Sequence, residues 1–199
     1  MALRFAGKHC AIVGATGIIG SSIAKAFASQ GAVLSLLGRT AIDVRSRLEP
    51  QLTPYQPTPG AQPDRPSQHR FIRLDVSSAS GIQAVFAPKS QDAQIDAVGP
   101  VDILVNCAGI SQTTILKRTS DSEINDILNT NLTATMLACK YAKVQDKGCI
   151  INVSSLMATK PAAGAAAYAA AKAGVVGLTG ALCLEMAARA VRLMYKRIS

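Results

Sequence analysis

The strongest constraint on the fold is a regular alternation of short apolar runs with longer stretches of helical spacing. Each run has five or six residues and is mostly apolar, which is typical of buried strands. Strands are predicted over residues 8–13, 32–37, 71–76, 101–106 and 149–153. Helices are predicted over about 18–29, 41–48, 78–97, 121–144 and 165–190. Because parallel strands need crossover connections, this order predicts an α/β fold with a Rossmann-like, doubly wound parallel sheet of strand order 3-2-1-4-5.

A single domain over 1–199 is expected, because a chain of this length with 49% hydrophobic residues can enclose one core. Aromatic residues make up 4% and Trp is absent, so Ala, Ile, Val and Leu must fill that core. Residues 50–66 hold six of the nine prolines and lack hydrophobic periodicity. They are expected to form an insertion on the surface.

The formal net charge of +9 fits a nucleic-acid site, an anionic cofactor site, a face for an acidic protein, or a solvated basic face. Lys and Arg do not cluster with interleaved aromatic residues, which argues against nucleic acid and favours a phosphate-rich cofactor. The five cysteines have neither CxxC nor metal-ligand spacing, so we expect no metal and a reducing compartment. Lys172 and Glu185 within 165–190 argue against a membrane span. With no clear targeting segment, the cytoplasm or the mitochondrial matrix is expected.

Gly14, Gly17 and Gly20 lie three residues apart between the first predicted strand and the first predicted helix. Residues without Cβ let the backbone approach a pyrophosphate, whose charge the free N–H groups of the helix N-terminus can meet. This context favours a dinucleotide-binding turn over a tight structural turn. After the second strand, where NAD-specific folds place an acid, the sequence has Gly38-Arg39. A guanidinium can pair with a 2′-phosphate, which favours NADPH; NAD and a plain surface arginine are the alternatives.

Tyr168 and Lys172 are four residues apart in a predicted helix, so their side chains share one face. An ammonium beside a phenol stabilises the phenolate and makes it a usable proton donor or acceptor. Ser155 lies at the carboxyl end of the fifth strand, where ligands of open α/β sheets bind. Its hydroxyl can hydrogen-bond a substrate carbonyl, so these three residues are the candidate catalytic set.

Together these motifs resemble the short-chain dehydrogenase/reductase family, and the resemblance runs through nearly the whole chain. It is carried by Gly14 to Gly20, Asp75-Val76, Asn106-Cys107-Ala108-Gly109, Asn129-Thr130-Asn131-Leu132, Ser154-Ser155 and Tyr168-Ala-Ala-Ala-Lys172. The resemblance implies that Tyr168 protonates a carbonyl oxygen as hydride arrives from NADPH, and that Ser155 orients that oxygen. It also implies that Lys172 holds the nicotinamide ribose and that Asn131 binds a water relaying protons to Lys172.

The resemblance further implies that Asp75 bonds the adenine amine and that Asn106, Ala108 and Gly109 line the cofactor path. The whole implied cofactor-binding set is Gly14, Thr16, Gly17, Ile19, Gly20, Arg39, Asp75, Val76, Asn106, Ala108, Gly109, Tyr168 and Lys172. Taken singly, Asn106 and Asn131 fit plain backbone hydrogen bonding, and Asp75 fits a turn cap. Their common register with the other motifs favours the functional interpretation.

Leu104 to Ser111, followed by Leu116-Lys-Arg-Thr, resembles the branch of carbonyl reductases and 3-oxoacyl-(acyl-carrier-protein) reductases. That branch implies reduction of a 3-oxoacyl thioester in fatty acid synthesis, and the basic charge fits an acidic acyl carrier protein as partner. The branch also implies homo- or hetero-tetramers. The connection from Cys139 to Cys149 is about one helical turn shorter than the family's, which bears on the helix used for assembly.

The sequence departs from the family pattern at the glycine turn and near residue 199. Ile18 stands where a second glycine is usual, and Val13 where the family has Thr. Residues 191–193 fit the start of a sixth strand, whereas Met194 to Ser199 resembles nothing in the family. The strand over 149–153 is therefore expected at the sheet edge or beside a strand remnant, where it is a pairing hazard. The alternative function is an inactive or regulatory fragment that binds nucleotide or pairs with full-length subunits.

Overall fold

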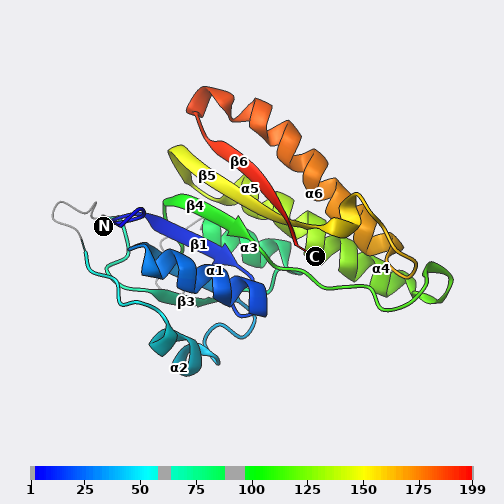
Figure 1. Ribbon diagram of the computed structural model, residues 1–199, viewed down its shortest axis with the longest axis horizontal. Helices are drawn as coiled ribbons and strands as arrows, with labels where there is room; N and C mark the ends of the chain where they lie inside the picture. The colour runs from blue at the N-terminus through cyan, green and yellow to red at the C-terminus, as the bar shows by residue number, and fades with distance from the viewer. Residues whose placement is uncertain (1–2, 58–63, 88–96, 199) are drawn as a thin grey trace.

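The computed structural model describes residues 3–57, 64–87 and 97–198. Six strands form one parallel sheet in the order β3-β2-β1-β4-β5-β6 (Figure 1). The strands are β1 (His9–Val13), β2 (Val33–Gly38), β3 (Arg70–Arg73), β4 (Val101–Asn106), β5 (Val144–Ser155) and β6 (Arg192–Ile198). The predicted Rossmann-like parallel sheet is confirmed, with one more strand at its edge.

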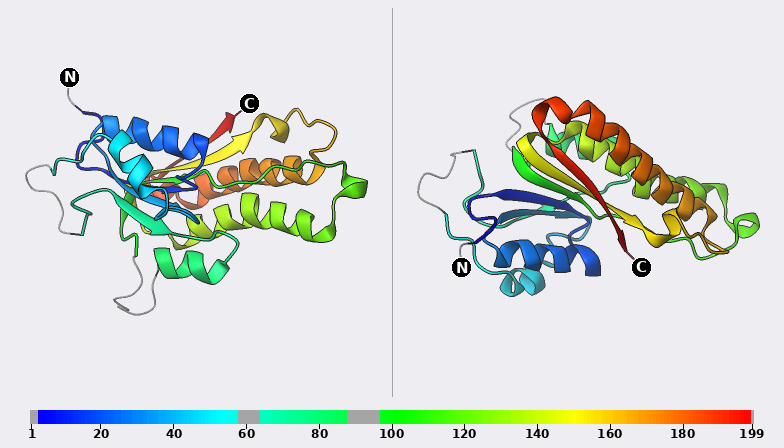
Figure 2. Two further views of the ribbon diagram at one scale, coloured as in Figure 1. Left: turned by 90° about the horizontal axis from the view of Figure 1, so that it is seen from below. Right: turned by 45° about the horizontal axis from the view of Figure 1, so that its top comes forward.

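Helices pack on both faces of the sheet (Figure 2). They are α1 (Ile18–Ser29), α2 (Arg45–Leu48), α3 (Ala79–Phe86), α4 (Asp121–Leu128), α5 (Ala134–Tyr141) and α6 (Ala166–Glu185). Short 3-10 turns are η1 (Glu49–Gln51), η2 (Leu116–Arg118), η4 (Leu156–Ala158) and η5 (Ala187–Arg189). Alternate residues of β1 point to opposite faces: Cys10 and Ile12 pack in the cluster containing Ala24 of α1, and Ala11 and Val13 in the cluster containing Phe86 of α3.

Several element boundaries differ from the prediction. The helix predicted over 121–144 is divided by a π-helical segment, η3 (Asn129–Thr133), and ends at Tyr141. The predicted strand over 149–153 extends in both directions, because β5 starts pairing with β4 at Val144. Only Arg45–Leu48 of the region predicted over 41–48 is helical. The helix predicted over 78–97 ends at Phe86, and its predicted continuation over 88–96 lies outside the described residues.

Of the two alternatives expected for 149–153, the sheet edge is wrong and the neighbouring sixth strand is confirmed. β6 pairs with β5 along its whole length, from Cys149 opposite Arg192 to Ser155 opposite Ile198. The segment 194–198, which matched no family motif, supplies most of this strand because Met, Tyr and Ile fit a pleated surface beside the apolar β5. The expected remnant at 191–193 is therefore a complete strand, and β6 itself forms the edge among the described residues.

Most described residues of the Pro-rich segment 50–66 lie at the surface, but two of its side chains are buried. Leu52 is buried in the core cluster on the α1 side of the sheet. Arg65 has a buried side chain that pairs with the Asp102 carboxylate at the start of β4. Prolines interrupt regular structure here without excluding the segment from the core, and residues 58–63 lie outside the described chain.

Helix α6 is the one described helix long and apolar enough to cross a membrane by length and composition, with a mean hydropathy of 1.4. The fold gives another reason for this composition. The helix packs along β5 and β6, and Leu182 contacts the core cluster (Figures 1 and 2). Small side chains of α6 such as Ala169 and Ala171 are buried, and Ala171 packs in a cluster with Ile127 of α4.

Candidate functional site

The carboxyl ends of β1, β2, β3 and β4 meet at one edge of the sheet, and a cavity of about 470 Å³ opens there. The predicted cofactor residues that line it are Gly14, Thr16, Gly17, Arg39, Asp75, Val76, Ala108 and Gly109. They come from four separate strand-to-helix connections, which only the folded sheet brings together. The sequence prediction of a shared nucleotide site therefore corresponds to one physical cavity.

The glycine turn is held in shape by close backbone packing. Gly14 has φ of +85°, and a Cβ built there would lie 2.5 Å from the Ala108 nitrogen. A Cβ on Gly20 would lie 2.2 Å from the Gly14 carbonyl oxygen, so both positions require glycine. Gly17 is the N-cap of α1 and supplies no side-chain cap, and a Cβ there would make only an ordinary contact, 3.8 Å from the Gly14 oxygen. Such a turn, opening into the cavity at a helix N-terminus, fits a pyrophosphate.

The two isoleucines of this turn point away from the cavity. Ile18, which stands where the family has glycine, is 88% exposed, so its side chain does not obstruct the site. Ile19, a member of the predicted cofactor set, is 40% exposed and is not among the residues that line the cavity. Gly20 is buried beneath the turn and supports it from behind. The altered glycine spacing is thus accommodated at the surface.

Arg39 and Asp75 lie at the β2 and β3 side of the cavity, and both are exposed. Hydrogen bonds from the Ser77 backbone N–H (3.0 Å) and hydroxyl (2.8 Å) lower the pKa of the Asp75 carboxyl, and the Arg39 charge lowers it further. A Cβ on Gly38 would lie 3.0 Å from the Thr16 hydroxyl, so glycine keeps β2 against the turn. Arg39 is thereby presented at the cavity next to an ionised carboxylate.

Tyr168 and Lys172 occupy successive turns at the start of α6, where the helix meets the end of β5. Lys172 is buried, its Nζ donates to the Val153 carbonyl at 3.0 Å, and it lies 5.8 Å from the centre of the Tyr168 ring. Burial lowers the pKa of Lys172 to about 8. Ser155 ends β5 with its Oγ accepting from the Met157 N–H at 3.2 Å. The phenol, the ammonium and the hydroxyl thus gather where α6 meets the carboxyl end of β5.

Asn131 completes this group from the π-helical segment. Its Nδ2 donates to the carbonyls of Ile110 (2.8 Å) and Ile127 (2.9 Å), while its buried Oδ1 has no hydrogen-bond partner. The amide takes the Ile127 carbonyl that an α-helix would give to the Asn131 N–H, which accounts for the local π geometry. A Cβ on Gly109 would lie 2.6 Å from Asn131 Oδ1 and 3.3 Å from Lys172 Nζ. Glycine at 109 therefore leaves the space in which a water can join these two groups.

Comparison with known proteins agrees with this geometry. A family model described as short chain dehydrogenase matches residues 8–195. The chain belongs to the short-chain dehydrogenase/reductase family. A mouse 3-oxoacyl-(acyl-carrier-protein) reductase is 32% identical over 189 residues, covering 94% of this chain and 72% of that protein. A reductase of the same name from Vibrio cholerae is 34% identical over 193 residues, covering 95% and 71%.

Solved structures give the same family. A dehydrogenase/reductase from Sinorhizobium meliloti superposes with a TM-score of 0.79 and 28% identity over 98% of this chain and 73% of its own. A short-chain dehydrogenase/reductase from Serratia marcescens gives a TM-score of 0.80 and 26% identity, over 97% and 74%. The chain is therefore a short-chain oxidoreductase by descent, and members of this family use nicotinamide cofactors, NAD(H) or NADP(H).

Asn106, predicted to line the cofactor path, lies behind the cavity of this family member. Its Nδ2 donates to Asn152 Oδ1 at 2.8 Å and to Cys139 Sγ at 3.3 Å. Asn152 in turn donates to the Thr179 hydroxyl at 3.0 Å. These buried side chains connect β4, β5, α5 and α6, so Asn106 supports the site without lining it.

Sequence reasoning missed several residues that line the cavity. Thr40 does so from the turn after β2, and Asp126 and Thr130 from α4 and η3, yet none belongs to a motif with a chemical signature. Cys107 also lines it, in the middle of a quoted motif, and burial raises the pKa of its thiol. The periodicity of 121–144 was the signal available for Asp126 and Thr130, because it places them one turn apart on one face.

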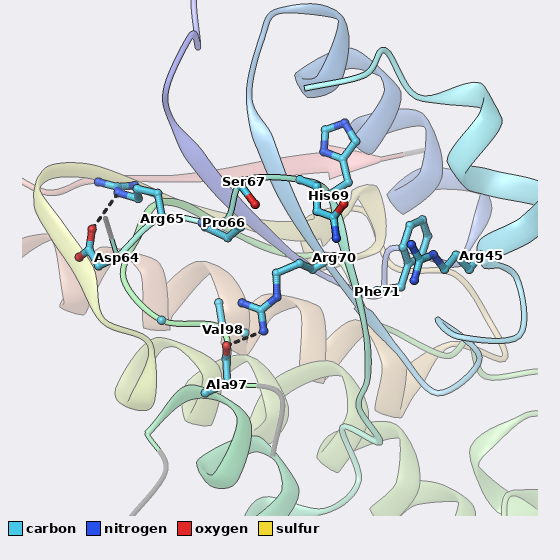
Figure 3. Close-up of a pocket in the computed structure, with 12 residues that line it drawn as sticks. Arg45, Asp64, Arg65, Pro66, Ser67, His69, Arg70, Phe71, Ala97 and Val98 are labelled. Carbon is cyan, nitrogen blue, oxygen red and sulfur yellow. Dashed lines mark hydrogen bonds and ion pairs between the residues drawn. The ribbon is translucent and has the colours of Figure 1, made fainter. Parts of the chain in front are cut away.

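A second hollow, of about 570 Å³, lies at the other end of the strands, before β3 and β4 (Figure 3). Its cationic side chains have partners: Arg45 pairs with Glu49, Arg65 with Asp64, and Arg70 with the Ala97 carbonyl. Those arginines therefore serve the fold in this structure. Within the described ranges, no group of His, Cys, Asp and Glu has metal-binding geometry.

Proposed function

We propose that this chain is an NADPH-dependent reductase that converts a keto group to a secondary alcohol, with a 3-oxoacyl thioester as substrate. The observation that carries the proposal is the meeting of Lys172 and Asn131 in the space beside Gly109, which itself lines the nucleotide cavity, with the Tyr168 ring centre 5.8 Å from Lys172 Nζ. Proton donors and a nucleotide site are thus contiguous. When bound, the nicotinamide supplies the hydride.

The protein's own groups supply the proton. Lys172 stabilises a phenolate at Tyr168 electrostatically, so the Tyr168 hydroxyl can give its proton to the oxygen of a reduced carbonyl. Ser155 donates a hydrogen bond to the same carbonyl oxygen and orients it. The unpartnered Oδ1 of Asn131 holds a water from which Lys172 can restore the proton. Buried Lys172, with a pKa of about 8, suits proton exchange near neutral pH.

Arg39 supports the choice of NADPH over NADH. Its guanidinium lines the cavity at the carboxyl end of β2, where a carboxylate would repel a 2′-phosphate. Support for the thioester comes from the similarity to proteins named 3-oxoacyl-(acyl-carrier-protein) reductase at 32% and 34% identity. The net charge of +9 suits an acidic carrier protein as the bearer of that substrate.

The test is oxidation of NADPH by the purified chain with acetoacetyl thioesters, carried on coenzyme A or on acyl carrier protein. Turnover is expected, and Tyr168→Phe should reduce kcat by about 10²-fold to 10⁴-fold. Tyr195→Phe, on the exposed edge strand, is the matched control and should retain kcat. NADPH binding by fluorescence without turnover of any ketone would refute the enzyme and support the alternative of a nucleotide-binding fragment.

The cofactor choice has a separate test. Arg39→Ala should weaken NADPH binding by about 1.5–3 kcal/mol, the worth of a charged hydrogen bond, and leave NADH binding nearly unchanged. Equal losses for both nucleotides would refute the assignment of Arg39 to the 2′-phosphate. Arg47→Ala, an exposed arginine of α2 that does not line the cavity, controls for general charge.

A further inference from the structure

Gln112 joins the loop after β4 to the first turn of α6. Its Oε1 accepts from the Ala167 N–H at 2.8 Å and from the Tyr168 N–H at 3.3 Å. Its Nε2 donates to the Thr114 carbonyl at 2.9 Å and to the Thr119 hydroxyl at 3.0 Å. Because backbone N–H groups only donate and a carbonyl only accepts, these partners fix the orientation of the amide. Both the oxygen and the nitrogen of this half-buried side-chain amide are therefore hydrogen-bonded.

Helix α6 needs an acceptor of this kind. The second and third N–H groups of a helix have no partner within it and are usually met by a Ser, Thr, Asp or Asn at the N-cap. In this chain Ser78 caps α3 and Ser120 caps α4 in that way. The N-cap of α6 is Ala165, which has no side-chain acceptor. Gln112, 55 residues before Ala167, supplies the missing acceptor from another part of the chain.

The loop that carries Gln112 is itself anchored at both ends. Three residues before it, Gly109 lines the nucleotide cavity, and the Ile110 carbonyl accepts from Asn131. After it, the hydroxyl of buried Thr119 bonds to the Thr114 hydroxyl at 3.0 Å and to the Ile115 carbonyl at 3.1 Å. Gln112 therefore ties the backbone of Tyr168 to the same loop that lines the cavity and contacts Asn131.

We propose that Gln112 is a positioning residue for Tyr168: by capping α6 from the 109–119 loop, its side-chain amide sets where the phenol stands relative to Ser155 and the nucleotide cavity. Gln112 acts through the backbone of Tyr168. The inference rests on the proposed reductase function for its catalytic consequence, but the capping itself does not. Loss of the cap should misplace the phenol while leaving the glycine turn and the nucleotide cavity intact.

The test compares Gln112→Ala with Gln112→Glu in steady-state kinetics and NADPH binding. Gln112→Ala removes the acceptor and should lower kcat by about 10-fold to 100-fold, with the Kd for NADPH within about twofold of wild type. Gln112→Glu keeps an acceptor for the two N–H groups, and its negative charge is favourable at a helix N-terminus, so kcat should recover in part. Gln51→Ala, which removes a side-chain bond to the Arg47 carbonyl within the α2–η1 segment, is the matched control.

Amide hydrogen exchange gives a readout independent of turnover. The Ala167 and Tyr168 amides should exchange at least about tenfold faster in Gln112→Ala than in wild type. The Gly81 amide, which donates to the Ser78 hydroxyl, should exchange at the same rate in both. Wild-type kcat in Gln112→Ala would overturn the inference. If that variant does not fold, Gln112→Glu decides, and NADPH binding with kcat still about 100-fold reduced would overturn it. Absence of turnover in the wild type would refute the proposed function alone, since the exchange measurement still tests the cap.

Discussion

Replacing Lys172 with Met is expected to stabilise the fold near neutral pH in the absence of cofactor. Lys172 is 4% exposed, and among the described residues no acid pairs with it; its Nζ donates to the Val153 carbonyl. Burial lowers its pKa from 10.5 to about 8. This pKa difference means that the charged form of Lys172 lowers the free energy of unfolding by about 3 kcal/mol. Met fills a similar volume without the charge.

The dependence on pH separates this effect from lost packing. Below about pH 8 both the folded and the unfolded chain hold the Lys172 proton, so the destabilisation is fully present. Between about pH 8 and pH 10.5 only the unfolded chain holds it, and wild-type stability rises with pH. Loss of the bond to Val153 costs Lys172→Met about 1 kcal/mol at every pH. The advantage of the variant should therefore shrink by about 3 kcal/mol across this window.

The assay is urea unfolding followed by circular dichroism, for wild type and Lys172→Met, at a series of pH values spanning the window. Differences between the two chains cancel the titration of other groups. Lys25→Met, at an exposed position of α1, should show no such trend. A constant difference between wild type and Lys172→Met from about pH 7 to pH 11 would refute the reasoning.

Three further substitutions test other parts of the structure. Gly20→Ala should destabilise the fold by about 1–3 kcal/mol in urea unfolding, since its Cβ would lie 2.2 Å from the Gly14 oxygen, whereas Gly17→Ala, with 3.8 Å, should not. Asp102→Asn should cost about 3–5 kcal/mol, because the buried Arg65 side chain loses its buried carboxylate partner and keeps only the exposed Asp64; a loss below about 1 kcal/mol would contradict a buried ion pair. The pKa of Asp102 is held low, against burial, by Arg65 and the His9 N–H, so wild-type stability should fall below about pH 3.8 more steeply than that of Asp102→Asn. Asn131→Ala should lower the thermal midpoint and abolish turnover, since two carbonyls lose their donor; an unchanged midpoint would argue against that role.

Local signals predicted most of the fold and the helix face that Tyr168 and Lys172 share. The runs at 8–13 and 101–106 are short, apolar and bounded by glycine or polar residues, and they form β1 and β4 within one residue. Tyr168 and Lys172 could be paired from their spacing alone, because a helix fixes which side chains share a face. Contacts that depend only on local geometry can be predicted from a single sequence.

Features that depend on distant partners were not predictable. Nothing near residue 65 indicates that Arg65 meets Asp102, because the pair forms only when the start of β4 is in place. The strand at 192–198 has no strong alternation and is stabilised by its pairing with β5. Ile19 and Asn106 were assigned to the cofactor set because their positions match the family motifs. In the folded chain the Ile19 side chain is exposed, and Asn106 lies behind the cavity.

The buried amides behind the cavity fix how β4 and β5 are aligned. Asn106 lies opposite Asn152 in the parallel ladder, and the two side chains are hydrogen-bonded within the same buried layer. Sliding β5 by one residue would turn Asn152 to the other face and leave the Asn106 amide buried without its partner. The same slip would turn the Ser155 side chain to the other face of the sheet. An apolar pair at these positions would not favour one alignment in this way, so the two amides specify the register that places Ser155 at the carboxyl end of β5.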